Sequence, residues 1–205
     1  MATNARRTLI LSALLASVVA LSACDRAPQM SSPGTFKGID ITGADYAKTL
    51  AMTDADGKDR TLADFKGKVV VVFFGFTQCP DVCPSTLQEL AEVKRRLGPD
   101  GAKLQAVFVS LDPDRDTPQL LKAYMANFDS SFVALRGTPE ATAATAKHFK
   151  VFYAKVPGRT EGSYTIDHTA GAYVFDTKGR VRLFTRHGMG PEAMLQDLKQ
   201  LMAEG

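Results

Sequence analysis

The chain has 205 residues, a formal net charge of +3, 45% hydrophobic residues and 23% charged residues. This composition excludes a disordered or fibrous chain, and the length suits one ordinary domain with a packed core. Nucleic acid is disfavoured as a partner, because the longest basic cluster is Lys94-Arg95-Arg96 and phosphates require a clustered basic surface.

The N-terminus carries a processing signal. Two arginines precede an apolar run over residues 9–21, which is too short to span a bilayer comfortably, so residues 1–23 are predicted to be a signal peptide. The residues at the end of this run resemble a bacterial lipobox, Leu21-Ser22-Ala23-Cys24. In a lipobox the cysteine after the cleavage site is lipidated, so Cys24 is the predicted membrane anchor.

Lipidation of Cys24 predicts a protein that is attached to the membrane without spanning it. Two or three acyl chains would hold it stably, since each buried methylene contributes about 0.8 kcal/mol. A cleaved signal that leaves Cys24 free, or an uncleaved membrane helix, are the alternatives. Residues 24–35 are expected to form the anchor and a short tether, and residues 36–205 a single domain.

The first predicted elements of the domain lead to a pair of cysteines. Residues 50–62 contain Asp54-Ala55-Asp56-Gly57 between strand-like flanks, which predicts a hairpin. Residues 68–74 are apolar and β-branched after a lysine, which favours a central strand covered on both faces. Cys79 and Cys83 follow directly. Ser85-Thr86-Leu87-Gln88 then has the form of a capping box that opens a helix, although the helix could begin at the cysteines themselves.

The remaining elements alternate between strands and helices. They are a strand at 104–111, a helix opened by Thr117-Pro118, a strand near 132–135, a helix opened by Thr138-Pro139-Glu140, an insertion, a hairpin at 172–175 and 181–184, and a helix opened by Pro191. This order resembles the thioredoxin fold, an α/β fold with a central mixed sheet flanked by helices, here with an N-terminal hairpin extension. In such folds the site lies beyond the carboxyl end of the first central strand, which is where the cysteines stand.

The cysteine pair favours a metal site, with a disulfide or a redox couple as alternatives. On a helical turn Cys79 and Cys83 would stand at i and i+4, with Cβ atoms about 5–6 Å apart. That separation suits two sulfurs at roughly 2.3 Å from one ion, whereas a disulfide needs Cβ atoms about 3.5–4.5 Å apart. Soft thiolates suit copper(I), and a neutral imidazole from His168 would complete the site or hold copper(II). Zinc fits less well, because a structural zinc site uses four protein ligands.

Three blocks of sequence together resemble the Sco family, also called SenC. They are Gly75-Phe76-Thr77-Gln78-Cys79-Pro80-Asp81-Val82-Cys83-Pro84, Asp112-Pro113-Asp114-Arg115-Asp116-Thr117-Pro118 and Asp167-His168-Thr169. The resemblance implies a copper-binding assembly factor for the binuclear copper A centre of cytochrome c oxidase. It further implies that Cys79, Cys83 and His168 bind one copper ion as Cu(I) or Cu(II).

The family resemblance and the predicted signal peptide together indicate the cellular location and the partners of the protein. The protein would lie on the periplasmic side of the bacterial inner membrane, where an oxidising environment calls for a thiol reductase as a partner. Its other expected partners are subunit II of cytochrome c oxidase and a second copper chaperone as donor.

The main competing hypothesis is a thiol-disulfide oxidoreductase that reduces the target cysteines of the oxidase. Such enzymes usually have two residues between their cysteines and a cis-proline before the later hairpin. Here the spacer has three residues, and the segment between Gly158 and Gly190 contains His168 and no proline, which favours metal binding. A peroxidase of the peroxiredoxin type is weaker, because position 76 is Phe where its motif has Thr or Ser. Enzymatic activity is therefore left open, with a metallochaperone preferred.

Other chemistry-bearing residues receive structural interpretations. His148 is expected at a helix end as a C-terminal cap, and His187 and Met189 in a glycine-flanked turn away from copper. The segment 112–117 is predicted to cap the next helix, and a partner-facing acidic loop is considered as an additional role for it. The aromatic residues near the cysteines are expected in the core and in the walls of the site: Phe73, Phe74 and Phe76.

Overall fold

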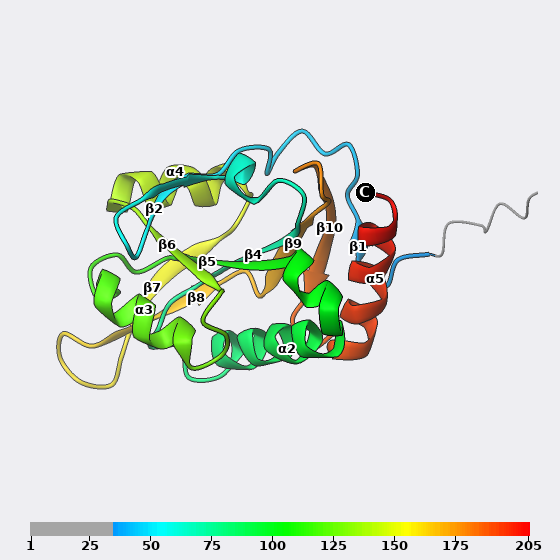
Figure 1. Ribbon diagram of the computed structural model, residues 1–205. Helices are drawn as coiled ribbons and strands as arrows, with labels where there is room; N and C mark the ends of the chain where they lie inside the picture. The colour runs from blue at the N-terminus through cyan, green and yellow to red at the C-terminus, as the bar shows by residue number, and fades with distance from the viewer. Residues whose placement is uncertain (1–34) are drawn as a thin grey trace, which may run out of the picture. The chain divides into compact units, whose positions relative to one another are not determined.

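An eight-stranded sheet and a separate two-stranded ribbon form the frame of the protein (Figure 1). The computed structural model describes residues 35–205. The sheet has the order β1-β10-β9-β4-β5-β6-β2-β3, and the ribbon consists of β7 and β8. The strands are β1 (Ile39–Asp40), β2 (Ala51–Asp54), β3 (Asp59–Thr61), β4 (Val69–Gly75), β5 (Leu104–Ser110), β6 (Val133–Arg136), β7 (Tyr153–Pro157), β8 (Tyr164–His168), β9 (Gly171–Phe175) and β10 (Val181–Arg186). The helices are α2 (Val82–Arg96), α3 (Pro118–Ala126), α4 (Pro139–His148) and α5 (Pro191–Ala203), with short 3-10 helices η2 (Leu62–Phe65) and η3 (Gly98–Lys103).

Strands β4 and β5 form the centre of the sheet, and every residue of both is buried. They pair in parallel from Val69 opposite Leu104 to Gly75 opposite Ser110, while β4 pairs antiparallel with β9 on its other side. A strand covered on both faces needs a continuous apolar run, which is what the sequence provides here. The predicted α/β fold with a central mixed sheet is thereby confirmed.

Helices cover both faces of this sheet and define two hydrophobic cores. On one face Val71 and Phe73 of β4 pack in a cluster with residues of α2, α3 and α5. On the other face Val72 and Phe74 pack in a cluster with residues of η2 and α4. The alternation follows from the two-residue period of a strand. Figure 1 shows α4 on the opposite side of the sheet from α2.

Helix α2 begins earlier than the predicted capping box. Its first residue is Val82, so Ser85 lies inside the helix, and its hydroxyl donates to the carbonyl of Asp81 at 2.8 Å. The capping-box interpretation is therefore wrong, and the alternative start near the cysteines is correct. Pro84 is tolerated in the first turn because the amides there have no partner within the helix. By contrast, Thr117 and Thr138 cap α3 and α4 as predicted.

The expected insertion is an ordered hairpin. Strands β7 and β8 pair antiparallel from Pro157 opposite Tyr164 to Tyr153 opposite His168. His168, which the sequence placed only within the segment between Gly158 and Gly190, is thus the last residue of a strand. Since an isolated two-stranded ribbon is only marginally stable, the position of His168 depends on what holds this ribbon to the domain.

The predicted N-terminal features mostly precede the described part of the chain. The signal peptide over residues 1–23, the lipidated Cys24 and all of the tether except Thr35 lie outside the described residues. Among residues 35–205, no helix combines the length and the apolar character needed to cross a membrane.

Candidate metal centre

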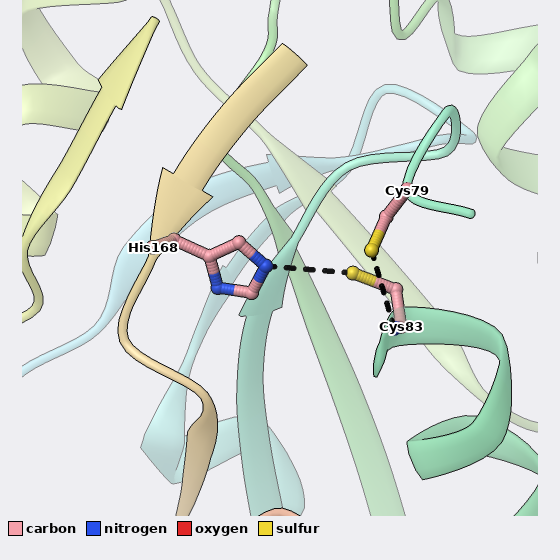
Figure 2. Close-up of side chains that lie close together, drawn as sticks. All are labelled: Cys79, Cys83 and His168. Atoms are coloured by element: carbon pink, nitrogen blue, oxygen red, sulfur yellow. Dashed lines mark hydrogen bonds between the residues drawn. The ribbon is translucent and has the colours of Figure 1, made fainter. Parts of the chain in front are cut away.

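Three side chains from three different elements converge beyond the carboxyl end of β4 (Figure 2). Cys79 lies in the turn after β4, Cys83 is the second residue of α2, and His168 ends β8. Their donor atoms all lie within 4.8 Å of one another. Within residues 35–205 this is the one such group of His, Cys, Asp or Glu side chains that could hold a metal ion.

The two cysteines do not share a helical turn. Cys79 precedes Asp81, the residue before the first residue of α2, so the predicted i and i+4 positions on one helix are wrong. Instead, the turn places the Cys79 sulfur at the start of the helix, where the amide of Cys83 donates to it at 3.4 Å. Amides at a helix N-terminus have no partner within the helix and stabilise a thiolate.

The two thiols have opposite electrostatic environments. The pKa of Cys79 is lowered to about 5, and the largest cause is a hydrogen bond from the Cys83 thiol. The backbone amides of Asp81 and Cys83 lower this pKa further, whereas burial of the sulfur raises it. The pKa of Cys83 is raised, first by its hydrogen bond to Cys79 and then by its burial. The pair therefore holds one thiolate and one thiol at neutral pH, and a metal ion that binds both sulfurs would release the Cys83 proton.

The imidazole of His168 presents one nitrogen to the cysteines. Its Nδ1 lies 3.1 Å from the carbonyl oxygen of Thr169 and donates to it, while its Nε2 lies 3.7 Å from the Cys83 sulfur. A backbone partner for the second ring nitrogen is common for metal-ligating histidines, because it fixes both the tautomer and the ring orientation. Phe73 and Phe76 contact the imidazole in edge-on arrangements, with ring centroids 6.1 Å away in both cases, as expected for walls of the site.

Two residues that the sequence motifs contain without revealing their roles support the cysteines. Gly75 makes room for Cys83, since a Cβ at this glycine would lie 2.7 Å from the Cys83 sulfur. Asp116 fixes the start of the cysteine loop: it accepts from the hydroxyl of Thr77 and from the hydroxyl of Ser110, each at 2.6 Å. Burial is the main cause that raises the pKa of Asp116, and these hydrogen bonds oppose it.

The acidic segment 112–117 faces inward. Asp112 and Asp116 are fully buried, and exposed Asp114 is paired with Lys155 at 2.8 Å. A partner-facing acidic loop is therefore the wrong interpretation of this segment, whose Thr117 caps α3 as expected. Thr77 and Tyr164, partners of Asp116 and Asp112 outside this segment, lie 39 and 52 residues away, so these contacts were not predictable from local sequence.

The other two histidines lie outside the group. Nε2 of His148, at the end of α4, accepts the amide hydrogen of Lys48 at 3.0 Å. Nδ1 of His187 lies 3.2 Å from the hydroxyl of Thr86. Met189 is partly buried against the hydrophobic core. His187 and Met189 are in the structural roles expected for them, whereas His148 bonds to the distant segment of Lys48 instead of capping its own helix, so that prediction is wrong.

Comparisons with known proteins agree on one family. The SCO1/SenC family model matches residues 40–203. A SCO2-like protein of Rickettsia felis is 32% identical over 149 residues, which are 72% of this chain and 73% of that protein.

Solved structures agree as well. The structure of Bradyrhizobium japonicum ScoI with copper bound is 41% identical, with a TM-score of 0.68 over 75% of this chain and 97% of that one. A SCO1/SenC family lipoprotein from Bacillus anthracis is 29% identical, with a TM-score of 0.63 over 77% of this chain and 98% of that one.

Proposed function

The chain belongs to the SCO1/SenC family, and from this premise we propose that it is a copper metallochaperone that binds one copper ion through Cys79, Cys83 and His168. Its target would be the copper A centre of cytochrome c oxidase, as the family resemblance implies. The observation that carries the proposal is the convergence of two sulfurs and one imidazole nitrogen within 4.8 Å. The copper-bound relative from Bradyrhizobium supports the choice of metal.

The donor set fits copper in both oxidation states. An ion at roughly 2.3 Å from each sulfur can contact both when the sulfurs are no more than about 4.6 Å apart, so the donors need to move little. Thiolates are soft ligands that suit copper(I), and the imidazole supplies the harder donor that copper(II) needs. The hydrogen bond from Nδ1 to Thr169 leaves the lone pair of Nε2 free for the metal.

The partial exposure of the proposed ligands suits transfer of the copper ion to a partner better than its permanent storage. Cys83 is fully buried, whereas Cys79 and His168 are partly exposed. A partner could therefore approach the ion from the side of Cys79 and His168 and exchange its own ligands for these two. This is the behaviour required of a donor to subunit II of the oxidase, and of an acceptor from a second copper chaperone.

We further propose that the protein is attached through lipidated Cys24 to the periplasmic side of the bacterial inner membrane. The lipobox-like sequence before Cys24 supports this, and so does the existence of a lipoprotein in the same family. In that oxidising compartment Cys79 and Cys83 would form a disulfide, so a thiol reductase is required as a partner.

Thiol reduction of the same target is the second candidate function. The thiolate of Cys79 beside the thiol of Cys83 favours it, because a thiolate is the species that attacks a disulfide. The histidine separates the two functions. A reductase depends on the cysteines, whereas a copper(II) site depends on His168 as well.

The test is the His168→Ala variant, with His187→Ala as the matched control. We expect His168→Ala to weaken copper(II) binding strongly and to abolish support of oxidase assembly, while the Cys79–Cys83 disulfide potential stays nearly unchanged. His187→Ala should behave like the unmodified protein. If His168→Ala keeps full copper(II) affinity and supports assembly in cells that lack the native protein, the copper site is misassigned and the reductase function replaces it.

A further inference from the structure

We propose that Arg115 is a positioning residue that sets the location of His168 relative to the cysteine loop and thereby controls copper(II) binding. The proposal rests on the proposed copper site. It concerns a residue that touches none of the three predicted ligands.

The ribbon that carries His168 is not hydrogen-bonded into the main sheet, because β7 and β8 form a sheet of their own. Within β8 only Ile166 is buried, and its other residues are partly or fully exposed. A ribbon with so little buried surface gains little stability from its own core. Its position must therefore depend on specific contacts along its length.

Arg115 contacts the ribbon and the cysteine loop at the same time. Its Nη1 donates to the carbonyl oxygen of Tyr164, the first residue of β8, at 2.8 Å. The same Nη1 donates to Oε1 of Gln78, the residue before Cys79, at 3.1 Å. One planar side chain thus joins the strand of the histidine to the loop of the first cysteine.

The guanidinium is itself held by contacts on several sides. Its Nε donates to the carboxylate of Asp112, which is fully buried. The hydroxyl of Tyr164 donates to the other oxygen of this carboxylate at 2.7 Å. In addition, the guanidinium carbon lies 3.6 Å from the centroid of the Tyr164 ring, and the Phe76 ring is 5.9 Å away on the cysteine loop. Asp112, Arg115 and Tyr164 form one network that fixes the start of β8.

The network reaches the metal centre through the strand. His168 is four residues after Tyr164 on β8, and functional groups must be held within about 0.5 Å of their productive position. If the start of β8 is released, Nε2 moves away from the cysteine sulfurs. Copper(I) can be held by two thiolates alone, so displacement of His168 should lower mainly the affinity for copper(II).

The experiment compares Arg115→Gln and Arg115→Lys in the full chain. Copper(II) affinity should fall roughly 10- to 100-fold in Arg115→Gln, the range for loss of a residue that orients a metal ligand. Copper(I) affinity should stay within about twofold, since it rests on the sulfurs. Arg115→Lys should not restore copper(II) binding, because an ammonium lacks the planar group that stacks on Tyr164 and bonds in several directions.

Arg136→Gln is the matched control. Arg136 bonds to the same segment, with its Nη2 donating to the carbonyl oxygen of Pro113 at 2.8 Å, but it bonds to neither the ribbon nor the cysteine loop. Its copper(II) affinity should equal that of the unmodified protein. Equal losses of copper(I) and copper(II) affinity in Arg115→Gln, or no loss of either, would overturn the positioning role.

A second readout needs no copper and separates this proposal from the copper assignment. In the copper-free protein, NMR cross-relaxation between the ring protons of His168 and Phe76 reports the position of the ribbon. The signal should weaken in Arg115→Gln and persist in Arg136→Gln. An unchanged signal in Arg115→Gln would contradict the positioning role, whether or not His168 binds copper.

Discussion

Gly75 is the position where the smallest change to the chain should disturb the site most directly. A Cβ built at this last residue of β4 would lie 2.7 Å from the Cys83 sulfur and 2.8 Å from a ring carbon of Phe108. Non-bonded atoms need about 3.5–4.0 Å, so Gly75→Ala requires a displacement of about 1 Å. Metal–ligand distances tolerate only about 0.2 Å, so the sulfur leaves its binding position.

The magnitude of the effect follows from overpacking. An added methyl in a tightly packed core costs about 1–3 kcal/mol of unfolding free energy, and each kcal/mol lowers Tm by roughly 2–4 °C in a domain of this size. Thermal denaturation of the copper-free protein measures this cost. Copper(I) affinity, measured against a competing chelator, should fall roughly 10- to 100-fold, as for other changes that displace a ligand.

A matched control is Gly137→Ala. Its Cβ would meet Cβ of Ala141 and Cε of Met52 at 3.0 Å, so it also crowds packed atoms, but none of them belongs to the site. It should lower Tm without changing copper affinity. If Gly75→Ala binds copper(I) as tightly as the unmodified protein, the Cys83 sulfur does not need the space that the missing Cβ of Gly75 leaves. The described geometry would then not be that of the copper-binding site.

Three further predictions concern the cysteines. Because the pKa of Cys79 is lowered to about 5, its thiolate persists above that pH. The alkylation rate of Cys79 should therefore be constant from about pH 7 to 9 and fall below about pH 5, while Cys83 stays unreactive. Mass spectrometry distinguishes the two cysteines, and an alkylation rate of Cys79 that rises through about pH 8–9 would contradict this prediction. Oxidation to the Cys79–Cys83 disulfide should abolish copper(I) binding, and uptake of one equivalent as tightly as by the reduced protein would show that the sulfurs are not ligands. Cys24→Ser should block lipid labelling and leave the protein unprocessed or soluble, so normal labelling would exclude Cys24 as the anchor.

The parts of the fold that were predictable are those with a strong local signal. The apolar run of β4 and the Thr-Pro starts of α3 and α4 each act over a few residues, and the structure confirms them. The ribbon was missed because β7 and β8 are five residues long and largely exposed, so they show no clear apolar period. Their pairing depends on the rest of the domain.

The site was predictable to the extent that topology and motif determine it. A strand end followed by a helix brings Cys79 and Cys83 together, and the resemblance to the Sco family supplied His168, which is 85 positions from Cys83. The contribution of Arg115 and Asp116 to the site could not be predicted, because the partners that connect them to it, Tyr164 and Thr77, lie 49 and 39 residues away. Hydrogen bonds between residues so far apart in the chain produce no repeating pattern in the sequence from which they could be predicted.

X-ray absorption spectroscopy of the copper(II)-loaded protein identifies the atoms bound to the metal. We expect one copper ion per chain with two sulfur neighbours and one imidazole nitrogen, and loss of one sulfur neighbour in Cys83→Ser and of the imidazole in His168→Ala. A spectrum without copper–sulfur scattering, or one that is the same in all three proteins, would contradict the proposed copper site.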